Sequence, residues 1–377
     1  MKTFTSHNIR LQNSGYENGK IIGEYTMSDE YLQVFLTKRM KDISKEADVP
    51  KIRRFEREIA KYLPEFLDEI SGFTDAANVT YQSFLHRFIY DWSANNCSQF
   101  IVFPSKTANN HVYTGHSYDW SLADEHLHII NMQPGRSFMG FSMMFFGRWN
   151  GLNEHGLCIQ HTGVQAAKME NQSVFCDHIF VRILLETCSA ADEALELYRE
   201  LPKAGGAGSM IIADAHGDAF LVDFAGPEFA YRKIGQERSE QFFCSTNHYP
   251  LETMWNQESF RGVHSIVRHS AMNAWFEKQG SLLGFPELQV LQASTVPDGP
   301  CCHYYADWLG TIRSMIYDST DVQAHVCFGS PVHNGWHRYD LHENTAGIER
   351  IVTCYDNEGA DARIWKRLPA GCTDIDR

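Results

Sequence analysis

The chain has 377 residues, of which 33 are basic and 47 acidic, so its formal charge is −14 at pH 7. This acidic balance argues against nucleic acid and anionic membranes as partners, because both favour a basic surface. No apolar run approaches the roughly 20 residues of a membrane helix, and the start, MKTFTSHNIRLQ, lacks the apolar core of a signal peptide. We therefore expect a cytoplasmic globular protein whose ten cysteines are reduced.

The part of the chain before residue 97 has a mainly helical pattern. A short strand is expected over residues 20–25. Apolar residues at three- and four-residue spacing then predict helices over residues 29–45, 50–70 and 79–92. These features indicate an N-terminal segment that is distinct in character from the rest of the chain.

After residue 97 the sequence becomes typical of short strands separated by Gly, Asn and Asp. Two helical stretches interrupt the strands, one over 177–187 with 190–200 and one over 263–278. The expected strands lie within SQFIVFP (98–104), NHVYTGHSYDW (110–120), GLCIQHTG (156–163), SMIIADAHGDAFLVDF (209–224) and TIRSMIYD (311–318). This order predicts an α+β fold with stacked, mainly antiparallel sheets and helices outside.

One candidate pair for nucleophilic chemistry is Cys97 with Asp119. Cys97 begins an expected strand, and Asp119 ends the next one, so antiparallel pairing would bring the two within reach. A buried carboxylate can orient the groups that manage a thiol proton. A single cysteine at a strand start is by itself more typical of a buried core residue.

Further elements follow Cys97 in a definite order. They are a strand–turn–strand in GLNEHGLCIQHTG (151–163), a hairpin turning at His216–Gly217, Asn247 in FCSTNHY (243–249), Arg268 in HSIVRHSAM (264–272), and the strands GTIRSMIYD (310–318) and HVCFGSP (325–331).

From about Asn96 to Tyr339, this ordered set resembles the choloylglycine hydrolase and penicillin acyltransferase group of N-terminal-nucleophile hydrolases (peptidase family C45). Cys97 matches the family nucleophile, and GHSYDW places Asp119 on the aspartate of its G-[RQ]-N-x-D element. The NEHGL turn matches an NExGL hairpin, STNHY places Asn247 on the oxyanion-hole asparagine, and HSIVRHSAM places Arg268 on a late SxxR arginine. GTIRSMIYD matches a T-x-x-S-x-x-x-D signature.

The resemblance implies a four-layer αββα sandwich over residues 97–377. Residues 1–96 would be a helical pro-segment or N-terminal subdomain that stays a partner of the enzyme if the chain is cleaved. His116 and Ser117 depart from the usual Arg or Gln and Asn of the G-[RQ]-N-x-D element. Arg261, in ESFR, competes with Arg268 for the arginine role, and the SxxR context favours Arg268.

The implied mechanism begins with autocatalytic cleavage between Asn96 and Cys97. The new α-amine, with an ordinary pKa of about 7.7–8.0, would take the thiol proton. Asn247 and backbone amides near His161 and Thr162 would hold the oxyanion. Asp119 would fix the amine and Arg268 would favour the thiolate. In an uncleaved chain, His116 or Asp119 would have to supply the base.

The expected activity is amide hydrolysis or acyl transfer on a small N-acyl compound, through an amide or thioester bond and a Cys97 acyl-enzyme. An uncleaved biosynthetic acyltransferase and a non-catalytic scaffold are the alternatives. Candidate substrate-binding residues are His116, Tyr118, His161, Thr162 and His248.

No cofactor or metal is expected, because Cys301, Cys302 and His303, with His325 and Cys327, fit no common zinc spacing. The sequence is compatible with a homo-oligomer and leaves the substrate open.

Overall fold

The computed structural model describes residues 1–41, 48–90, 96–133, 135–167, 174–202, 205–237, 239–342 and 345–375. Within these residues, ten strands form one large sheet. Its strands, in spatial order, are β11 (Glu228–Ile234), β10 (Ala219–Ala225), β9 (Ala207–Ala213), β8 (Cys158–Gly163), β7 (Asn150–Asn153), β5 (Phe138–Met143), β4 (Leu127–Asn131), β1 (Lys2–Leu11) and β18 (Gly347–Tyr355), with β6 (Gly147–Arg148) paired to β5.

A second sheet of seven described strands packs against the first. Its strands, in spatial order, are β12 (Phe242–Ser245), β2 (Asn96–Val102), β3 (Tyr113–Trp120), β15 (Leu309–Asp318), β16 (Gln323–Phe328) and β17 (Trp336–Asp340), with β14 (His303–Tyr304) paired to β15. A separate ribbon joins β13 (Arg261–Gly262) to β19 (Arg367–Leu368). The inner faces meet in apolar clusters, in which Met139 and Phe141 of β5 contact Met315 of β15 and Phe328 of β16.

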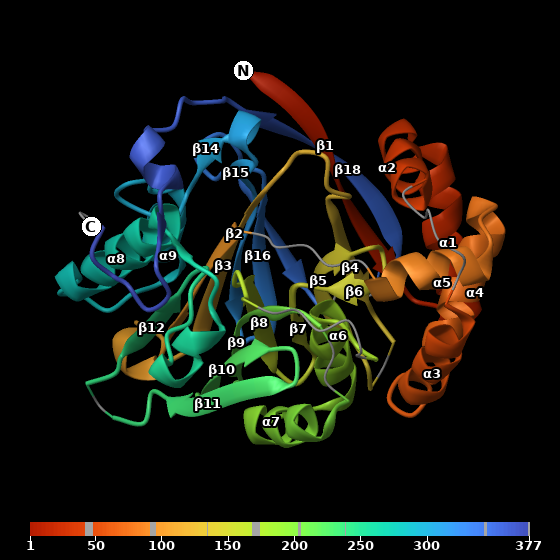
Figure 1. Cartoon of the computed structure of the whole chain (residues 1–377), viewed down its shortest axis with the longest axis horizontal. Coiled ribbons are helices and arrows are strands. Elements are labelled where there is room, and N and C mark those ends of the chain that lie inside the picture. Colours follow the sequence, from red (N-terminus) through yellow and green to blue (C-terminus); the bar gives the residue numbers. More distant parts are fainter. Residues whose placement is uncertain are drawn as a thin grey trace.

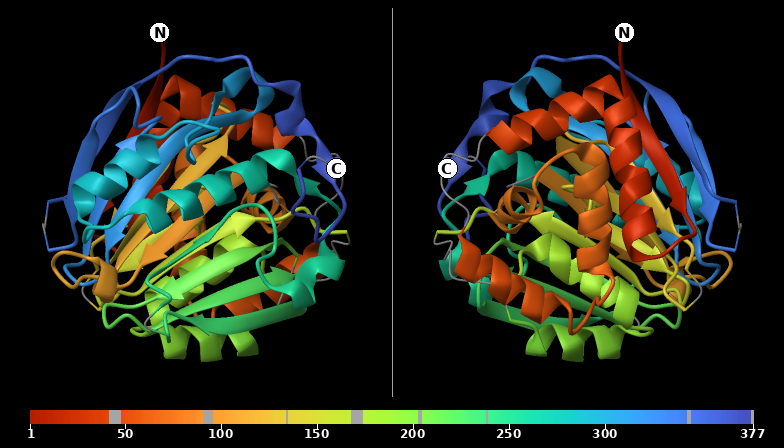
Figure 2. Two further views of the ribbon diagram at one scale, coloured as in Figure 1. Left: turned by 90° about the vertical axis from the view of Figure 1, so that its left-hand side faces the viewer. Right: turned by 90° about the vertical axis from the view of Figure 1, so that its right-hand side faces the viewer.

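Helices cover the outer faces of both sheets, as Figures 1 and 2 show. On the ten-stranded sheet lie α1 (Gly15–Ser28), α2 (Glu30–Lys41), α3 (Val49–Ile59), α4 (Phe66–Ala77), α5 (Tyr81–Tyr90), α6 (Asp177–Thr187) and α7 (Ala191–Glu200). On the seven-stranded sheet lie α8 (Val263–Lys278) and α9 (Phe285–Ala293). The predicted four-layer αββα arrangement is therefore confirmed.

Most of the elements expected from the sequence are present, but two expectations are wrong. The strand expected over residues 20–25 is wrong, because these residues lie inside α1. Glycines let this helix approach α4 closely: a Cβ on Gly19 would lie 1.7 Å from the Glu69 carbonyl oxygen. The helix expected over 50–70 is two helices, α3 and α4, and Pro64 lies in the break, where it provides no backbone N–H to continue the helix.

Residues before Cys97 are part of the sandwich rather than only a helical appendage. Strand β1 lies between β4, to which it is parallel, and β18, to which it is antiparallel. Ile9 is paired with Ile129 on one side and Ile348 on the other. The N-terminal segment therefore supplies an internal strand of the large sheet.

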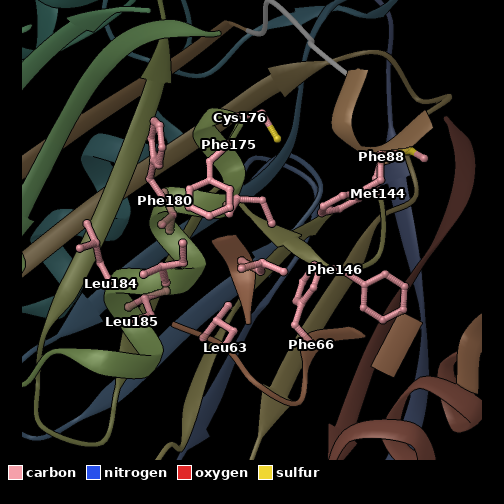
Figure 3. Close-up of a cluster of buried hydrophobic side chains, with 14 of the residues drawn as sticks. Leu63, Phe66, Phe88, Met144, Phe146, Phe175, Cys176, Phe180, Leu184 and Leu185 are labelled. Atoms are coloured by element: carbon pink, nitrogen blue, oxygen red, sulfur yellow. The ribbon is translucent and has the colours of Figure 1, made fainter. Parts of the chain in front are cut away.

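The helices of this segment share one hydrophobic core with the rest of the chain. Figure 3 shows Leu63, Phe66 and Phe88 in the same cluster as Phe146 and Phe180, and the Phe66 ring contacts that of Phe146. A buried ion pair adds to the contact, with Nη2 of Arg182 in α6 lying 2.6 Å from the Glu69 carboxylate in α4. No helix in the described ranges is both long and apolar enough to cross a membrane.

Candidate active site

Strand β2 carries the candidate nucleophile at its first residues. It pairs antiparallel with β3, so Cys97 lies opposite Tyr118 and Asn96 lies opposite Asp119. Side chains alternate between the faces of a strand. The Cys97 and Tyr118 side chains accordingly lie in one apolar cluster with Trp149, on the face toward the large sheet. The Asp119 side chain lies on the other face, where it meets α8.

Arg268, in the second turn of α8, joins the predicted catalytic residues. Its Nη1 donates to the carbonyl oxygen of Cys97 at 2.9 Å and to the Asp119 carboxylate at 2.8 Å. Its Nη2 donates to the amide oxygen of Asn247 at 2.6 Å. Arg268 and Asp119 are fully buried, so this ion pair is shielded from water. The guanidinium of Arg268 thus connects helix α8 to Cys97, Asp119 and Asn247, which come from three other parts of the sequence.

Asp119 is held from two sides. Besides the bond from Arg268, it accepts a hydrogen bond of 2.5 Å from the Thr311 hydroxyl of β15. Burial raises the pKa of Asp119 to about 6, although Arg268 and Thr311 both act in the opposite direction. The carboxylate is therefore mainly ionised at neutral pH and loses its charge under mildly acidic conditions.

Asn247 follows β12 and is oriented by three hydrogen bonds. Its amide oxygen accepts from the backbone nitrogen of Cys97 at 3.0 Å as well as from Arg268. Its amide nitrogen donates to the carbonyl oxygen of Gly163 at 2.8 Å. In the intact chain, the acceptor end of Asn247 thus faces Cys97, whereas the predicted oxyanion role would use its donor end.

The Cys97 thiol is completely buried. Burial, followed by the negative charge of Asp119, raises the pKa of Cys97, whereas Arg268, Arg313 and the Gly163 backbone amide act to lower it. The net direction favours the neutral thiol, so the thiol needs a base before it can act as a nucleophile.

A cleft of about 420 Å³ opens at the start of β2. It reaches Asn96, Asn247 and Gly163, but its lining does not include Cys97. The remaining walls are Trp120, Gln165, Phe260, Gly262, His264, Trp365 and Arg367. The mainly aromatic and polar walls suit a small organic ligand next to the Asn96–Cys97 bond.

His116 and His161, two predicted substrate-binding residues, lie inside the sandwich. Nε2 of His116 is 2.9 Å from the His161 carbonyl oxygen, and Nδ1 faces the Asn150 amide at 3.3 Å. Burial lowers the pKa of His116 to about 3 and that of His161 to about 4. The His161 ring stacks on Trp149 with centroids 4.9 Å apart. Both rings are therefore neutral, and His116 has both nitrogens engaged.

The other predicted residues are separated from the thiol by their own partners. Thr162 donates to the Thr246 carbonyl oxygen at 3.0 Å. His248 faces Ser265 at 2.8 Å, beneath α8. Arg261 pairs with Glu258 at 2.7 Å and does not join the Arg268 network. Geometry thus favours Arg268 over Arg261 at the site.

Two residues of the site were not singled out by sequence reasoning. Thr311 was visible as the first residue of the T-x-x-S-x-x-x-D signature, but a signature alone does not show that its hydroxyl meets Asp119. Gly163 follows the predicted oxyanion residues 161–162 by one position, and the structure makes its backbone the contact to both Cys97 and Asn247.

The cysteine- and histidine-rich positions near residue 301 do not all converge on one point, although Cys301 and His303 both contact the Ser330 hydroxyl. Cys301 contacts Ser330, Cys327 donates to the Asn334 carbonyl oxygen, and His325 packs on the ring of Phe285. Within the described ranges, the group of potential metal ligands that does converge is His111, Asp318 and Asp321, at the opposite end of β3 from Asp119.

Comparison with known proteins agrees with the family expectation. Residues 105–333, more than half of the chain, match the family described as acyl-coenzyme A:6-aminopenicillanic acid acyl-transferase. This match begins after Cys97, so the role of that residue depends on the geometry above. No curated protein matches at a significant level.

Similar solved structures include penicillin V acylase from Agrobacterium tumefaciens, with 13% identity, a TM-score of 0.38, and 67% of this chain and 90% of that chain covered. A mutant of conjugated bile acid hydrolase from Clostridium perfringens has 11% identity, a TM-score of 0.41 and coverage of 71% and 99%. A second variant of the same hydrolase has 11% identity, a TM-score of 0.38 and coverage of 72% and 93%. By the match over residues 105–333, the chain belongs to the acyl-coenzyme A:6-aminopenicillanic acid acyl-transferase family.

Proposed function

We propose that the protein is a cysteine amidohydrolase or acyltransferase that acts on a small N-acyl compound through an acyl group carried on Cys97. The observation that carries this proposal is that two side chains form hydrogen bonds with the backbone of Cys97. Asn247 accepts from its nitrogen and Arg268 donates to its carbonyl oxygen, while Asp119 fixes Arg268. Side chains from distant elements converge on one backbone unit, and this is unusual for an ordinary core cysteine.

The environment of the thiol supports activation by cleavage rather than by a side-chain base. Among the residues that the structure describes, no imidazole or carboxylate hydrogen-bonds the Cys97 sulfur. His116 is engaged with His161 and Asn150, and Asp119 lies on the opposite face of the sheet. The backbone nitrogen of Cys97 is the remaining candidate, and it becomes basic only as a free α-amine.

Cleavage would proceed by attack of the Cys97 sulfur on the Asn96 carbonyl carbon. The acyl group moves from nitrogen to sulfur, which breaks the Asn96–Cys97 amide and gives a thioester with a free amine. Water then hydrolyses the thioester, leaving a carboxylate on Asn96 and restoring the thiol. Asn247 already accepts from the nitrogen concerned, so it would hold the new amine beside the thiol.

In turnover, the amine takes the thiol proton and the thiolate attacks the substrate carbonyl. The tetrahedral oxyanion would be stabilised by the Gly163 backbone amide and, after the amide reorients, by Asn247. The protonated amine returns the proton to the leaving amine or thiol. Water then completes hydrolysis of the acyl-thioester, or a bound amine completes acyl transfer.

Intact-mass analysis tests this proposal. Active protein should consist of residues 1–96 and residues 97–377, and incubation with an acyl donor should add the acyl mass to the larger fragment. Cys97→Ala should remain one species of 43.1 kDa and take up no acyl group. An active protein that stays uncut at 43.1 kDa would contradict the cleavage step but not the acyl-enzyme. Acylation of Cys97→Ala to the wild-type extent would contradict the acyl-enzyme, and cleavage of Cys97→Ala into the two fragments would contradict the cleavage step.

A further inference from the structure

The guanidinium of Arg268 uses all five of its N–H groups, and His264 accepts two of them. Nη1 donates to the Cys97 carbonyl oxygen and to the Asp119 carboxylate, and one N–H of Nη2 donates to Asn247. Nε donates to the carbonyl oxygen of His264 at 3.1 Å, and the remaining N–H of Nη2 faces Nδ1 of the same residue, also at 3.1 Å. His264, in the first turn of α8, is therefore part of the hydrogen-bond network around Cys97.

The contact with Arg268 fixes where the imidazole of His264 carries its proton. A guanidinium can only donate, so Nδ1 accepts with its lone pair. Burial, followed by the positive charge of Arg268, lowers the pKa of His264 to about 3, so the ring is neutral at physiological pH. A neutral imidazole whose Nδ1 has no proton carries its single N–H at Nε2.

Nε2 of His264 lies at the wall of the cleft of about 420 Å³ beside the Asn96–Cys97 bond. His264, Gly262 and Asn96 all line this cleft. A Cβ on Gly262 would lie 2.4 Å from Nε2, so the edge of the ring fits here because residue 262 has no side chain. Among the residues that the structure describes, none accepts a hydrogen bond from Nε2. This N–H is thus an uncharged donor that Arg268 orients and that a ligand can use.

The rest of the cleft wall contains no competing acid. Within the described ranges, no Asp or Glu lines the cleft, and its charged group is Arg367, whose guanidinium carbon lies 4.4 Å from the centre of the Phe260 ring. In the proposed mechanism, the Gly163 amide and Asn247 already serve the oxygen of the scissile carbonyl, so the His264 donor is left for another substrate atom. A single uncharged N–H matches an uncharged oxygen, whose desolvation costs much less than that of an ion.

We propose that His264 binds the substrate by donating a hydrogen bond from Nε2 to an uncharged oxygen, such as that of a second carbonyl or a hydroxyl group. This inference rests on the proposed function and narrows it to N-acyl compounds that carry an oxygen acceptor besides the scissile carbonyl. Arg268, which holds the backbone of Cys97, also holds the imidazole that selects the substrate. One guanidinium thereby connects substrate recognition to the position of the nucleophile.

Benzyl methyl sulfone and benzyl methyl sulfide test this donor without turnover, because neither contains an acyl group. Both offer a ring to the aromatic walls, and they differ only in the two sulfone oxygens. NMR titration of the isotope-labelled full protein should show saturable binding of the sulfone. The Nε2 proton of His264, identified as the imidazole signal absent from His264→Gln, should shift with the sulfone and not with the sulfide. A ring protonated at Nδ1, sulfone binding without this shift, or no sulfone binding would each overturn the proposal.

Two amide variants separate the two nitrogens of the ring. The amide oxygen of Asn is as many bonds from the backbone as Nδ1, so His264→Asn keeps an acceptor for Arg268 but loses the donor in the cleft. The amide nitrogen of Gln corresponds in the same way to Nε2, so His264→Gln keeps the donor. The ratio of the sulfone to the sulfide dissociation constant should therefore rise about 3- to 10-fold in His264→Asn and change little in His264→Gln. An unchanged ratio in His264→Asn would overturn the proposal.

Gly262→Ala should raise the same ratio, because its methyl group would displace Nε2 from the cleft wall. Gly280→Ala is the control for this variant, since a Cβ on Gly280 would meet no atom within 4 Å. His269→Asn is the control for His264→Asn, because His269 lies on the same helix but contacts Asn273 and is not a lining residue of this cleft. Both controls should keep the wild-type ratio. A change in either control as large as in its partner variant would overturn the proposal.

These outcomes are independent of the proposed function. Sulfone binding through His264 without any acyl adduct on Cys97 would support the donor and refute the acyl-enzyme. An adduct on Cys97 with no response of His264 to the sulfone would do the reverse.

Discussion

The amide oxygen of Asn247 accepts a hydrogen bond of 3.0 Å from the backbone nitrogen of Cys97. This nitrogen belongs to the peptide bond whose cleavage would create the catalytic amine. Arg268 donates to the same amide oxygen, so the orientation of Asn247 is fixed with its acceptor toward Cys97. The intact chain therefore already positions the nitrogen that the proposed cleavage would convert into an amine.

Asn247→Ala should slow appearance of the two cleavage fragments about 100-fold, because a misplaced reacting group typically costs that much. Asn247→Asp keeps an acceptor for Cys97 and Arg268 but faces the Gly163 carbonyl oxygen with a second acceptor. The cleavage rate of Asn247→Asp should therefore lie between that of the alanine variant and that of the wild type. Intact-mass analysis at timed intervals after purification measures the cleavage rate of each protein. Equal rates for the wild type and both variants would show that Asn247 does not position this bond.

Replacing Arg268 should damage both stability and chemistry. Arg268→Met leaves Asp119 buried without its counter-charge, so the free energy of unfolding should fall by about 3–5 kcal/mol. Arg268→Lys keeps the positive charge, so this variant should fold. Its turnover number should nevertheless be at least 10-fold lower than that of the wild type, because one ammonium group cannot bridge Asp119, Cys97 and Asn247 at once.

Arg261→Lys is the control for Arg268→Lys. Arg261 is equally buried and paired with a carboxylate, Glu258, yet it does not contact the Cys97 network. Its turnover number should stay within a few-fold of wild type in the same assay. A comparable loss of turnover in both lysine variants would mean that general loss of packing, rather than the Arg268 bridge, limits the reaction.

The pH dependence of kcat/KM should contain an inflection from Asp119. Its pKa is raised to about 6, so the carboxylate is charged above this pH and neutral below it. Activity should fall as the pH decreases through about 6, because protonated Asp119 no longer balances Arg268. The α-amine must be neutral to accept the thiol proton, so kcat/KM should increase further as the pH is raised from about 7 to about 8.

Asp119→Asn should retain low activity without the inflection near pH 6. Glu125→Gln provides the control, because burial raises the pKa of Glu125 to about 7 although this residue does not contact the Asp119 network. The inflection near 6 should persist in Glu125→Gln. If it disappears there and survives in Asp119→Asn, the titrating group is not Asp119.

Elements whose sequence pattern lies within one segment could be predicted, whereas elements specified by contacts with distant segments could not. The ranges 177–187 and 263–278 were predicted as helices at the observed bounds, because their helical signal lies within a single segment. Strand β1 was not anticipated, because it is specified by pairing with β4 and β18, far away in the chain. Residues 20–25 looked like a strand because the packing of α1 on α4 is not visible in one segment.

The site shows the same division. Motif order was enough to select Cys97, Asp119, Asn247 and Arg268, which the structure brings together. It could not show that Thr311 meets Asp119 on one face of the sheet while Arg313 packs against Tyr118 on the other, because this depends on a bulge in β15. A one-residue shift in register reverses the face of a side chain, and sequence spacing alone cannot detect it.

Cleavage should leave a permanent two-chain protein. Residues 1–96 supply β1, which lies between β4 and β18 in the large sheet, and a share of the main apolar core. The two fragments should therefore elute together in size-exclusion chromatography at neutral pH and separate only in denaturant. Spontaneous separation of active fragments in native buffer would contradict this expectation.

The ion pairs of Arg182 should contribute measurably to that association. Arg182 contacts Glu69 of α4 and Glu186 of its own helix, each at 2.6 Å, and all three side chains are buried. Arg182→Met leaves two carboxylates without a cation, so the free energy of unfolding in urea should fall by about 3–5 kcal/mol. Adding Glu69→Gln and Glu186→Gln should recover part of this loss, because the uncompensated charges are removed.

Arg199→Met is the control for Arg182→Met. It breaks an exposed pair with Glu196 on α7, so it should change the urea midpoint little. Equal midpoints for Arg182→Met and Arg199→Met would show that the buried pairs do not hold the N-terminal segment.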